Sequence, residues 1–279
     1  MASPLCRRSG IRFGDSAVRP FLIVVSILAM VVGARAQQPF ANDNADVAIY
    51  HRWHLESNNE FDFLPRSSYP SLHQDTQTIK FSYGLFRNCE VGMDFPLIVI
   101  FNSKASGLIS PFGLGDTDYS IKYNFLHEKL GSRRPSITAS LNIEPPTGSA
   151  KAQLGSGLID YYLNGIFEKT LSPKNTLRFN AGATFAGNTL TGVVGIKTRG
   201  TVFTGGTSFT RQFTSRLDLG VEVYGGYTAK AALGRGELQE QVGGNYALGK
   251  NLSLDFGFLT GQAVGSPHYG FQLGFSKDF

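Results

Sequence analysis

The stretch Asp116-Thr-Asp-Tyr-Ser-Ile-Lys-Tyr-Asn-Phe125 decides the fold of this chain. Its even-numbered positions hold Asp, Asp, Ser, Lys and Asn, and its odd-numbered positions hold Thr, Tyr, Ile, Tyr and Phe. Successive side chains of a β-strand point to opposite faces of a sheet. The stretch is therefore predicted to be a strand with one charged face and one apolar face.

The same alternation recurs from Val47 to the end of the chain, in segments of about ten residues. Strands of about 9–11 residues match a tilted crossing of the hydrocarbon layer of a bilayer. Twelve strands are predicted, at residues 45–55, 76–86, 90–101, 116–127, 136–145, 157–168, 176–186, 200–212, 216–227, 237–248, 251–261 and 268–279.

The connections between these strands alternate in length. Every second connection is short or rich in polar turn residues: 87–90, 129–135, 172–175, 214–215 and 249–250. Most of the others are longer and rich in Gly, Ser and Pro: 56–75, 102–115, 146–156, 187–199, 228–236 and 262–267. Short turns on one side and long loops on the other are typical of outer-membrane barrels.

The N-terminal 36 residues have the pattern of a secretory signal peptide. Four Arg between residues 7 and 19 precede the uncharged apolar run 21–34, and Ala34-Arg35-Ala36 forms a small-x-small cleavage site. An apolar run of this length is too short for a membrane helix, which needs about 20 residues. We expect residues 1–36 to be cleaved and residues 37–279 to form the mature protein.

Removing the leader changes the charge of the protein. The whole chain holds 26 basic and 21 acidic residues, of which residues 1–36 contain five Arg and one Asp, leaving 21 and 20. A nearly neutral mature chain lacks the concentrated basic surface that nucleic-acid binding requires, so no nucleic-acid partner is expected. Cys6 leaves with the leader and Cys89 stays alone, which excludes an intramolecular disulfide.

The predicted fold class is all-β: a transmembrane antiparallel β-barrel of about twelve strands, following a cleaved signal peptide. A soluble sandwich or lipocalin-like barrel is the alternative, in which the apolar face would be buried. Aromatic residues at the edges of the apolar faces favour the membrane barrel, because such residues form interfacial girdles. Phe279 ends the last amphipathic strand in register with Phe275 and Phe271. It is predicted to be a C-terminal signal for the barrel-assembly machinery, and outer-membrane lipid is the expected surrounding.

Three motifs occur in a characteristic order: Gly113-Leu-Gly-Asp-Thr-Asp-Tyr-Ser-Ile-Lys-Tyr123, then Pro145-Pro-Thr-Gly148, then Gly155-Ser-Gly-Leu-Ile-Asp-Tyr-Tyr162. Together with the closing Phe279, this order resembles the outer-membrane transporter family associated with the meta-pathway of phenol degradation, across about residues 45–279. Glu144 departs from that pattern, in which the lead-in to Pro-Thr-Gly is more apolar. The resemblance implies a channel-like barrel, and the family name implies uptake of hydrophobic or aromatic molecules.

The polar faces of the strands are predicted to line the barrel interior. The candidate lumen-lining residues are Asp116, Asp118, Lys122, Glu144, Asp160, Arg178, Arg216, Asp218, Glu222 and Asp255. Both signs of charge are present, with Arg178 and Arg216 the suspected partners of Asp160 and Asp218. Such charges can pair across the interior and close it, or line a narrow wet path, and the sequence leaves both possibilities open.

No catalytic, cofactor-binding or metal-binding residues are predicted. A hydrolase needs a nucleophile, a base and an orienting group, and no Gly-x-Ser-x-Gly elbow is present; Ser57 near His54 is the nearest approach to such a set. His51 and His54 are expected at the outer end of the first strand, with their rings on opposite faces, which argues against a shared metal. The predicted function is passive uptake of small solutes across the outer membrane, and the resemblance implies that these include hydrophobic or aromatic molecules. A closed structural or adhesive barrel is the first alternative, and a lipid-modifying barrel hydrolase the second.

Overall fold

The computed structural model describes residues 39–65, 72–102, 107, 109–129, 131–186, 199–229, 236–263 and 266–279. All of them belong to one compact unit, Gly33–Phe279. The predicted signal peptide, residues 1–36, lies outside the described residues and stays a prediction. Within the described ranges, no helix is long and apolar enough to cross a membrane.

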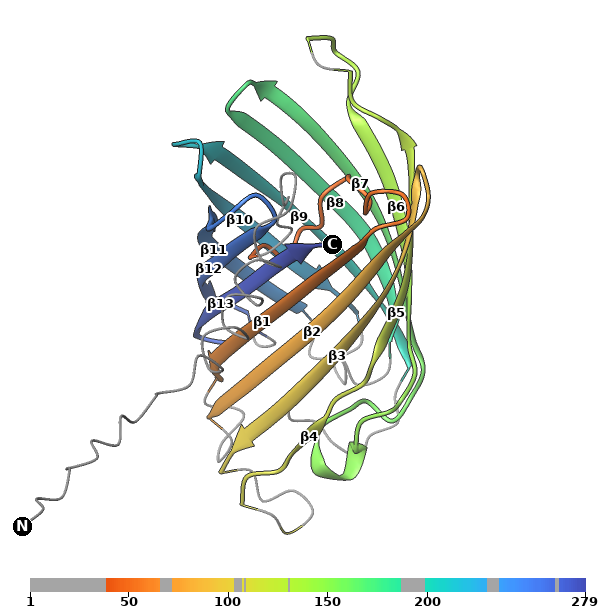
Figure 1. The fold of residues 1–279 in the computed structure, drawn as a ribbon. Helices are drawn as coiled ribbons and strands as arrows, with labels where there is room; N and C mark the ends of the chain where they lie inside the picture. Colours follow the sequence, from red (N-terminus) through yellow and green to blue (C-terminus); the bar gives the residue numbers. More distant parts are fainter. Residues whose placement is uncertain are drawn as a thin grey trace, which may run out of the picture. The chain divides into compact units, whose positions relative to one another are not determined.

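The described residues form thirteen strands and one short 3-10 helix, η3, at Ala150–Ala152 (Figure 1). The strands are β1 (Trp53–Phe63), β2 (His73–Phe86), β3 (Cys89–Phe101), β4 (Phe112–Leu114), β5 (Asp118–Leu126), β6 (Ser136–Glu144), β7 (Asp160–Ser172), β8 (Asn175–Ala186), β9 (Gly200–Gln212), β10 (Leu217–Tyr227), β11 (Gly236–Ala247), β12 (Leu252–Gly261) and β13 (Tyr269–Asp278).

The sheet is antiparallel and closes on itself. β1 pairs with β13 on one side and with β2 on the other, and β2 pairs in turn with β3. β4 and β5 both pair with β3, along Leu97–Val99 and Cys89–Asp94 respectively, so they are two halves of one strand interrupted at residues 115–117. In the described part of the chain the wall therefore has twelve strand positions, which confirms the predicted closed barrel.

The two faces of the wall have opposite chemistry, as β5 illustrates. Tyr119, Ile121 and Phe125 are 44%, 46% and 65% exposed, whereas Lys122 and Asn124 are 3% and 0% exposed. The apolar side chains therefore point outward and the polar side chains point inward. A soluble β-domain would bury its apolar face, so the outward apolar belt fits a barrel surrounded by lipid and rules out the soluble alternative.

The predicted first strand, residues 45–55, is wrong, because β1 runs from Trp53 to Phe63. The predicted loop 56–75 is wrong for the same reason. The middle of β1 has polar residues on its outward face as well, so its alternation is lost in the sequence. Ser57 accepts a hydrogen bond from Gln77 of β2 at 3.1 Å, and Asn59 donates to Asp75 at 2.7 Å. The outward polar groups are satisfied by one another, which makes the strand tolerable in the wall.

The barrel has one end with short connections and one with long connections, here called the turn end and the loop end. The turn-end connections are 87–88, 127–135, 173–174, 213–216 and 248–251, and the loop-end connections include 64–72, 145–159 and 187–199. Both ends of the barrel-forming chain meet at the turn end, where the N–H of Phe279 donates to the carbonyl of Trp53 at 2.9 Å. His54 also lies at this end, beside Asp278, so its predicted place at the outer end is wrong.

Candidate functional site

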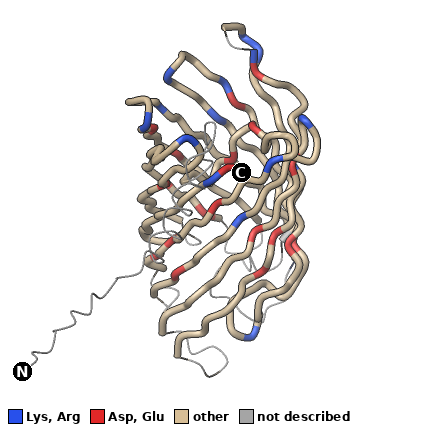
Figure 2. The backbone as a smooth tube through the Cα atoms, in the orientation of Figure 1, with Lys and Arg blue, Asp and Glu red and all other residues tan. Residues whose placement is uncertain are grey.

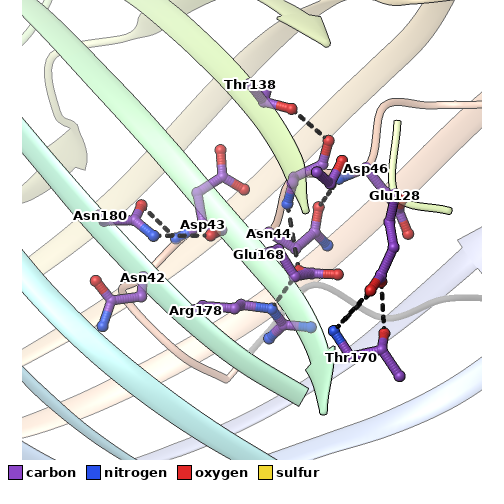
Figure 3. A network of polar contacts seen from close by, with 12 residues as sticks. Asn42, Asp43, Asn44, Asp46, Glu128, Thr138, Glu168, Thr170, Arg178 and Asn180 are labelled. Carbon is purple, nitrogen blue, oxygen red and sulfur yellow. Dashed lines mark hydrogen bonds and ion pairs between the residues drawn. The ribbon is translucent and has the colours of Figure 1, made fainter. Parts of the chain in front are cut away.

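Residues 39–48, which we name the lumen strap, lie inside the barrel and not in its wall, as the close view in Figure 3 shows for the central part. The carboxylate of Glu222 on β10 accepts hydrogen bonds from the backbone N–H groups of Ala41 and Asn42, both at 2.8 Å. Asn42 is fully buried. A strand side chain thus takes up backbone donors of the strap that burial would otherwise leave unpaired.

The strap is held at both of its ends by strands that are far apart around the barrel. Gln241 on β11 donates to the carbonyl of Pro39 at 2.6 Å. Glu90 on β3 accepts a hydrogen bond from the N–H of Ala48 at 2.5 Å. Because β3 and β11 are not neighbours in the sheet, the strap runs across the interior.

An ion pair with the buried Lys122 fixes the middle of the strap. Lys122 on β5 donates to the carboxylate of Asp43 at 2.9 Å and to the side-chain oxygen of Asn44 at 3.3 Å. Asn180 on β8 accepts from the N–H of Asp43 at 3.1 Å and donates to its carbonyl at 3.0 Å. Loss of one partner of such a pair leaves a buried charge unpaired, so this contact fixes the position of the strap strongly.

Ala45 is fully buried and is held through both of its backbone groups. Its carbonyl accepts hydrogen bonds from Asn124 at 2.8 Å and from Thr138 at 2.6 Å. Its N–H donates to Glu168 at 3.4 Å, and Glu168 also accepts from the Nε of Arg178 at 2.6 Å. The side chains on these inner strand faces therefore act as a receptor for a backbone segment.

Sequence reasoning missed the strap and assigned part of it to a strand. The run Asn42-Asp-Asn-Ala-Asp46 is rich in residues that favour turns and irregular backbone. That signal indicates a non-strand segment but does not reveal where the segment lies. Its position depends on tertiary contacts with strands more than 100 residues away, such as Asn180 and Glu222.

A cavity of about 610 Å³ lies inside the barrel against the strap, whose residues Pro39, Phe40, Ala41 and Asp43 form part of its wall. Most of the other lining side chains are polar. The charged residues that line the cavity are Asp43, Glu56, Glu60, Lys80, Asp94, Asp118 and Glu144.

The loop between β6 and β7 folds into the interior at the loop end. Ala152 and Leu154 pack against Ile98 and Ile100, which lie on the inward face of β3. Ile100 and Leu154 are 2% and 5% exposed. The cavity thus belongs to an interior that is occupied at two levels, by this loop and by the strap.

The three family-like motifs of the sequence meet at the interruption between β4 and β5. The carboxylate of Asp116 accepts hydrogen bonds from the N–H of Gly148 at 2.8 Å and of Ser156 at 2.5 Å. Thr147 accepts from the N–H of Thr117 at 2.8 Å. A Cβ added at Gly155 would lie 2.3 Å from the Asp116 carboxylate, so a side chain at this position would displace that carboxylate from its hydrogen bonds. The motifs therefore fasten the inward-folded loop to the wall.

The predicted lumen-lining residues have different positions. Asp118 and Glu144 line the cavity, Lys122 and Glu222 bind the strap directly, and Arg178 does so through Glu168. Asp116 binds the loop, and Asp160 and Asp255 are buried in the wall at 2% and 1% exposure. Asp218 lies on β10, and Arg216 is exposed in the turn before that strand. Arg178 is paired with Glu168, its neighbour in register on β7.

The nearest approach to a hydrolytic set, Ser57 and His54, is divided between the two faces of the wall. His54 is 8% exposed and lies between Asp278 and Glu56, with its ring nitrogens 2.6 Å and 2.9 Å from their carboxylates. Ser57 is on the outward face, where it accepts a hydrogen bond from Gln77. Ser57 and His54 therefore cannot act as a nucleophile–base pair in this arrangement. In the ranges that the structure describes, no group of three or more potential metal ligands occurs.

One carboxylate outside the strands stabilises the turn end. Glu128 accepts hydrogen bonds from the N–H and hydroxyl of Thr170, at 3.0 Å and 2.6 Å (Figure 3). It also accepts a hydrogen bond from the ammonium of Lys169. Burial acts to raise the pKa of Glu128, but these hydrogen bonds outweigh it and hold the pKa below its ordinary value of 4.5. The charged form of Glu128 therefore links β7 to the turn before β6.

Comparison with known proteins gives one family and a set of structures. The family described as "Putative MetA-pathway of phenol degradation" matches residues 72–279. No curated protein matches the chain. An outer membrane channel from Pseudomonas putida F1 is similar in structure, with a TM-score of 0.63, 14% identity, and coverage of 87% of this chain and 99% of the channel.

Two porins are also similar. The KdgM porin gives a TM-score of 0.53 at 11% identity, with 81% of this chain and 99% of the porin covered. The NanC porin gives 0.54 at 10% identity, with 80% and 98% covered. At such identities the likeness shows the fold alone, which is that of outer-membrane channels and porins. With its outward apolar belt, this barrel is located in the bacterial outer membrane.

Proposed function

Since the chain belongs to the MetA-pathway phenol-degradation family, we propose that it is a channel for passive uptake of small molecules across the outer membrane. The observation that carries the proposal is the cavity of about 610 Å³ inside a closed barrel. A volume of this size accommodates a small organic solute. The lumen strap and the inward-folded loop would restrict passage to small molecules.

The lining of the cavity favours polar solutes over purely hydrophobic ones. Its side chains include Asn58, Thr78, Asn142 and Gln241, besides the charged residues. A polar solute can exchange its hydrogen bonds to water for hydrogen bonds to these groups, whereas an apolar solute would leave them unpaired. The hydrophobic or aromatic substrates implied by the family name therefore need a polar group to fit this path.

A closed structural barrel is the second candidate function, and the strap favours it. Asn42 and Ala45 are fully buried, so the strap fills part of the interior completely. The two candidates differ in one measurable property, the permeability of a membrane that contains the protein.

The test is reconstitution of the folded full-length barrel into planar bilayers and liposomes. A channel gives stepwise conductance in concentrated KCl, and liposome swelling that decreases with the size of a neutral polar solute. Heat-unfolded protein from the same preparation is the control. Conductance and swelling equal to that control would overturn the channel and support the closed barrel.

Two further parts of the chain are assigned roles by this proposal. Residues 1–36 are a signal peptide removed during export, and N-terminal sequencing of the outer-membrane form should begin at Gln37.

Phe279 is the recognition residue for the barrel-assembly machinery. Its ring lies 4.6 Å from the ammonium of Lys277. Deletion of Phe279 should reduce the fraction of heat-modifiable barrel in membranes, and an unchanged fraction would refute this role.

A further inference from the structure

The wall of the cavity carries an excess of negative charge. Among its described lining residues, six are carboxylates and one, Lys80, is a cation. Asp43 is paired with Lys122, so five carboxylates face the single cation Lys80. Figure 2 shows acidic residues along the strands, whereas many of the basic residues lie at the ends of strands and in the connections. In a water-filled space with low-dielectric walls, like charges reinforce one another and attract counterions.

Three of these carboxylates lie with Lys80 in one row across neighbouring strands. In the antiparallel register Glu56 of β1 is opposite Lys80 of β2, and Lys80 is opposite Asp94 of β3. Asp94 is in turn opposite Asp118 of β5. Like charges directly opposite each other destabilise a sheet. Lys80 lies between Glu56 and Asp94 and is not opposite Asp118, so the Asp94–Asp118 pair gains from a further cation.

Several acceptor oxygens of the same wall lack a donor. The Oε2 of Glu56, the Oδ1 of Asp94 and the Oδ1 of Asn58 are buried and have no hydrogen-bond partner among the described residues. Glu56 is 2% exposed and lines the cavity. Buried acceptors without donors are costly, and a ligand with N–H groups would satisfy them.

We propose that this cavity is a binding site for small organic ammonium ions and gives the channel a preference for cations. The inference rests on the proposed channel function for its transport part, but not for its binding part. A primary ammonium supplies a positive charge and three N–H donors, which match the Asp94–Asp118 pair and the unpaired Oδ1 of Asp94. The unpaired Oε2 of Glu56, on the other side of Lys80, is a further acceptor in the same cavity. The cavity volume exceeds that of a bare ion, so an alkyl chain can be accommodated beside the strap.

The first experiment measures ion selectivity of the full-length barrel in a planar bilayer. The reversal potential in a KCl gradient gives the permeability of K⁺ relative to Cl⁻, and we expect K⁺ to be preferred by about tenfold. Asp94→Asn/Asp118→Asn keeps the shapes of the side chains and should bring the ratio close to unity. Asp218→Asn, which removes a charge outside the cavity lining, is the matched control and should keep the wild-type ratio.

The second experiment measures binding without transport. Butylammonium is titrated into the folded barrel in detergent and followed by calorimetry, with butyrate as the anionic probe. We expect butylammonium to bind, butyrate not to bind, and the double variant to lose affinity by about tenfold. Circular dichroism and heat-modifiability confirm that the variants are folded.

The outcomes separate the two proposals. A conducting barrel that prefers Cl⁻, or that binds butyrate as well as butylammonium, overturns the cation site while leaving the channel. A barrel that binds butylammonium but never conducts supports the site and overturns the channel. Binding that is equal in the wild type and the double variant assigns the ligand elsewhere and refutes the site.

Discussion

Glu222 is predicted to be the main anchor of the lumen strap. Removal of the Glu222 side chain should let the strap leave its place more often, so that the channel spends more time in an open state. The change is Glu222→Ala. It deletes the carboxylate that accepts the N–H groups of Ala41 and Asn42, both at 2.8 Å, from a side chain that is 3% exposed. The strands of the wall keep all of their own backbone hydrogen bonds, so the barrel wall itself should stay intact.

The size of the effect follows from the two lost hydrogen bonds. A hydrogen bond to a charged group contributes about 1.5–3 kcal/mol, and water in the lumen can partly replace the carboxylate. Taking the lower value for each of the two bonds, we expect strap docking to become less favourable by about 3 kcal/mol. Since 1.4 kcal/mol corresponds to a tenfold change, the ratio of docked to undocked strap should fall about a hundredfold.

Single-channel recording measures this ratio as the time spent at a higher conductance level. A chain lacking residues 39–48, with the leader kept, defines the level of the strap-free barrel. Glu237→Ala is the matched control, because Glu237 is a carboxylate on the adjacent β11 with no hydrogen bond to the strap in the described part of the chain. If the deletion leaves the conductance unchanged, the strap is not the constriction. If the deletion raises the conductance but Glu222→Ala does not increase the time spent at the higher level, other contacts hold the strap and the energetic reasoning is wrong.

Three other predictions concern the wall, the loop and the turn end. Asp116→Ala removes the carboxylate that accepts the N–H groups of Gly148 and Ser156, so the 145–159 loop should become cleavable by an added protease. Asp75→Ala changes a carboxylate on the outward face and should leave the loop resistant. Equal protease resistance of the two variants would contradict the fastening role of Asp116. Val221→Arg places a charge on the outward face midway along β10 and should lower the unfolding free energy by about 2–4 kcal/mol. Ser215→Arg in the preceding turn should change the unfolding free energy little. Denaturant titration of the barrel in lipid measures both, and equal effects would argue against a lipid-facing Val221. The pKa of Glu128 is lowered in the folded protein, so its stabilising effect is full above the ordinary carboxyl pKa and is lost as the pH falls through the lowered one; Glu128→Gln should therefore destabilise the barrel at neutral pH but not in strong acid, and a pH-independent difference in thermal stability would refute this.

The wall of the barrel could be predicted from the sequence because each strand faces lipid on one side and the lumen on the other. That difference is written into alternate residues wherever the outward face is apolar throughout, as in β5. It failed at β1, where Ser57 and Asn59 are outward but are satisfied by Gln77 and Asp75 of β2. Hydrogen bonds between the side chains of two strands remove the cost of placing polar groups on the lipid-facing side. The residue pattern of one strand alone does not show such bonds.

The interior was predictable in composition but not in its contacts. Parity placed Lys122, Glu222 and Asp118 on the inward face, whereas their partners depend on register and on a segment with no periodicity. Arg178 pairs with Glu168 because the two are opposite in the β7–β8 register. The strap, whose polar run has the composition of a loop, became visible only through its contacts with strands.

The strap also constrains the order in which the protein can assemble. Its contacts join residues 202 positions apart for Pro39 and Gln241, and 180 apart for Asn42 and Glu222. Contacts of such separation form late, because the intervening chain must first be ordered. β10 and β11 must therefore be in place before the strap has its receptor, although its residues are synthesised before every strand of the wall. The strap is thus made before the wall that receives it, and it can reach its native position only after strands near the far end of the chain have formed.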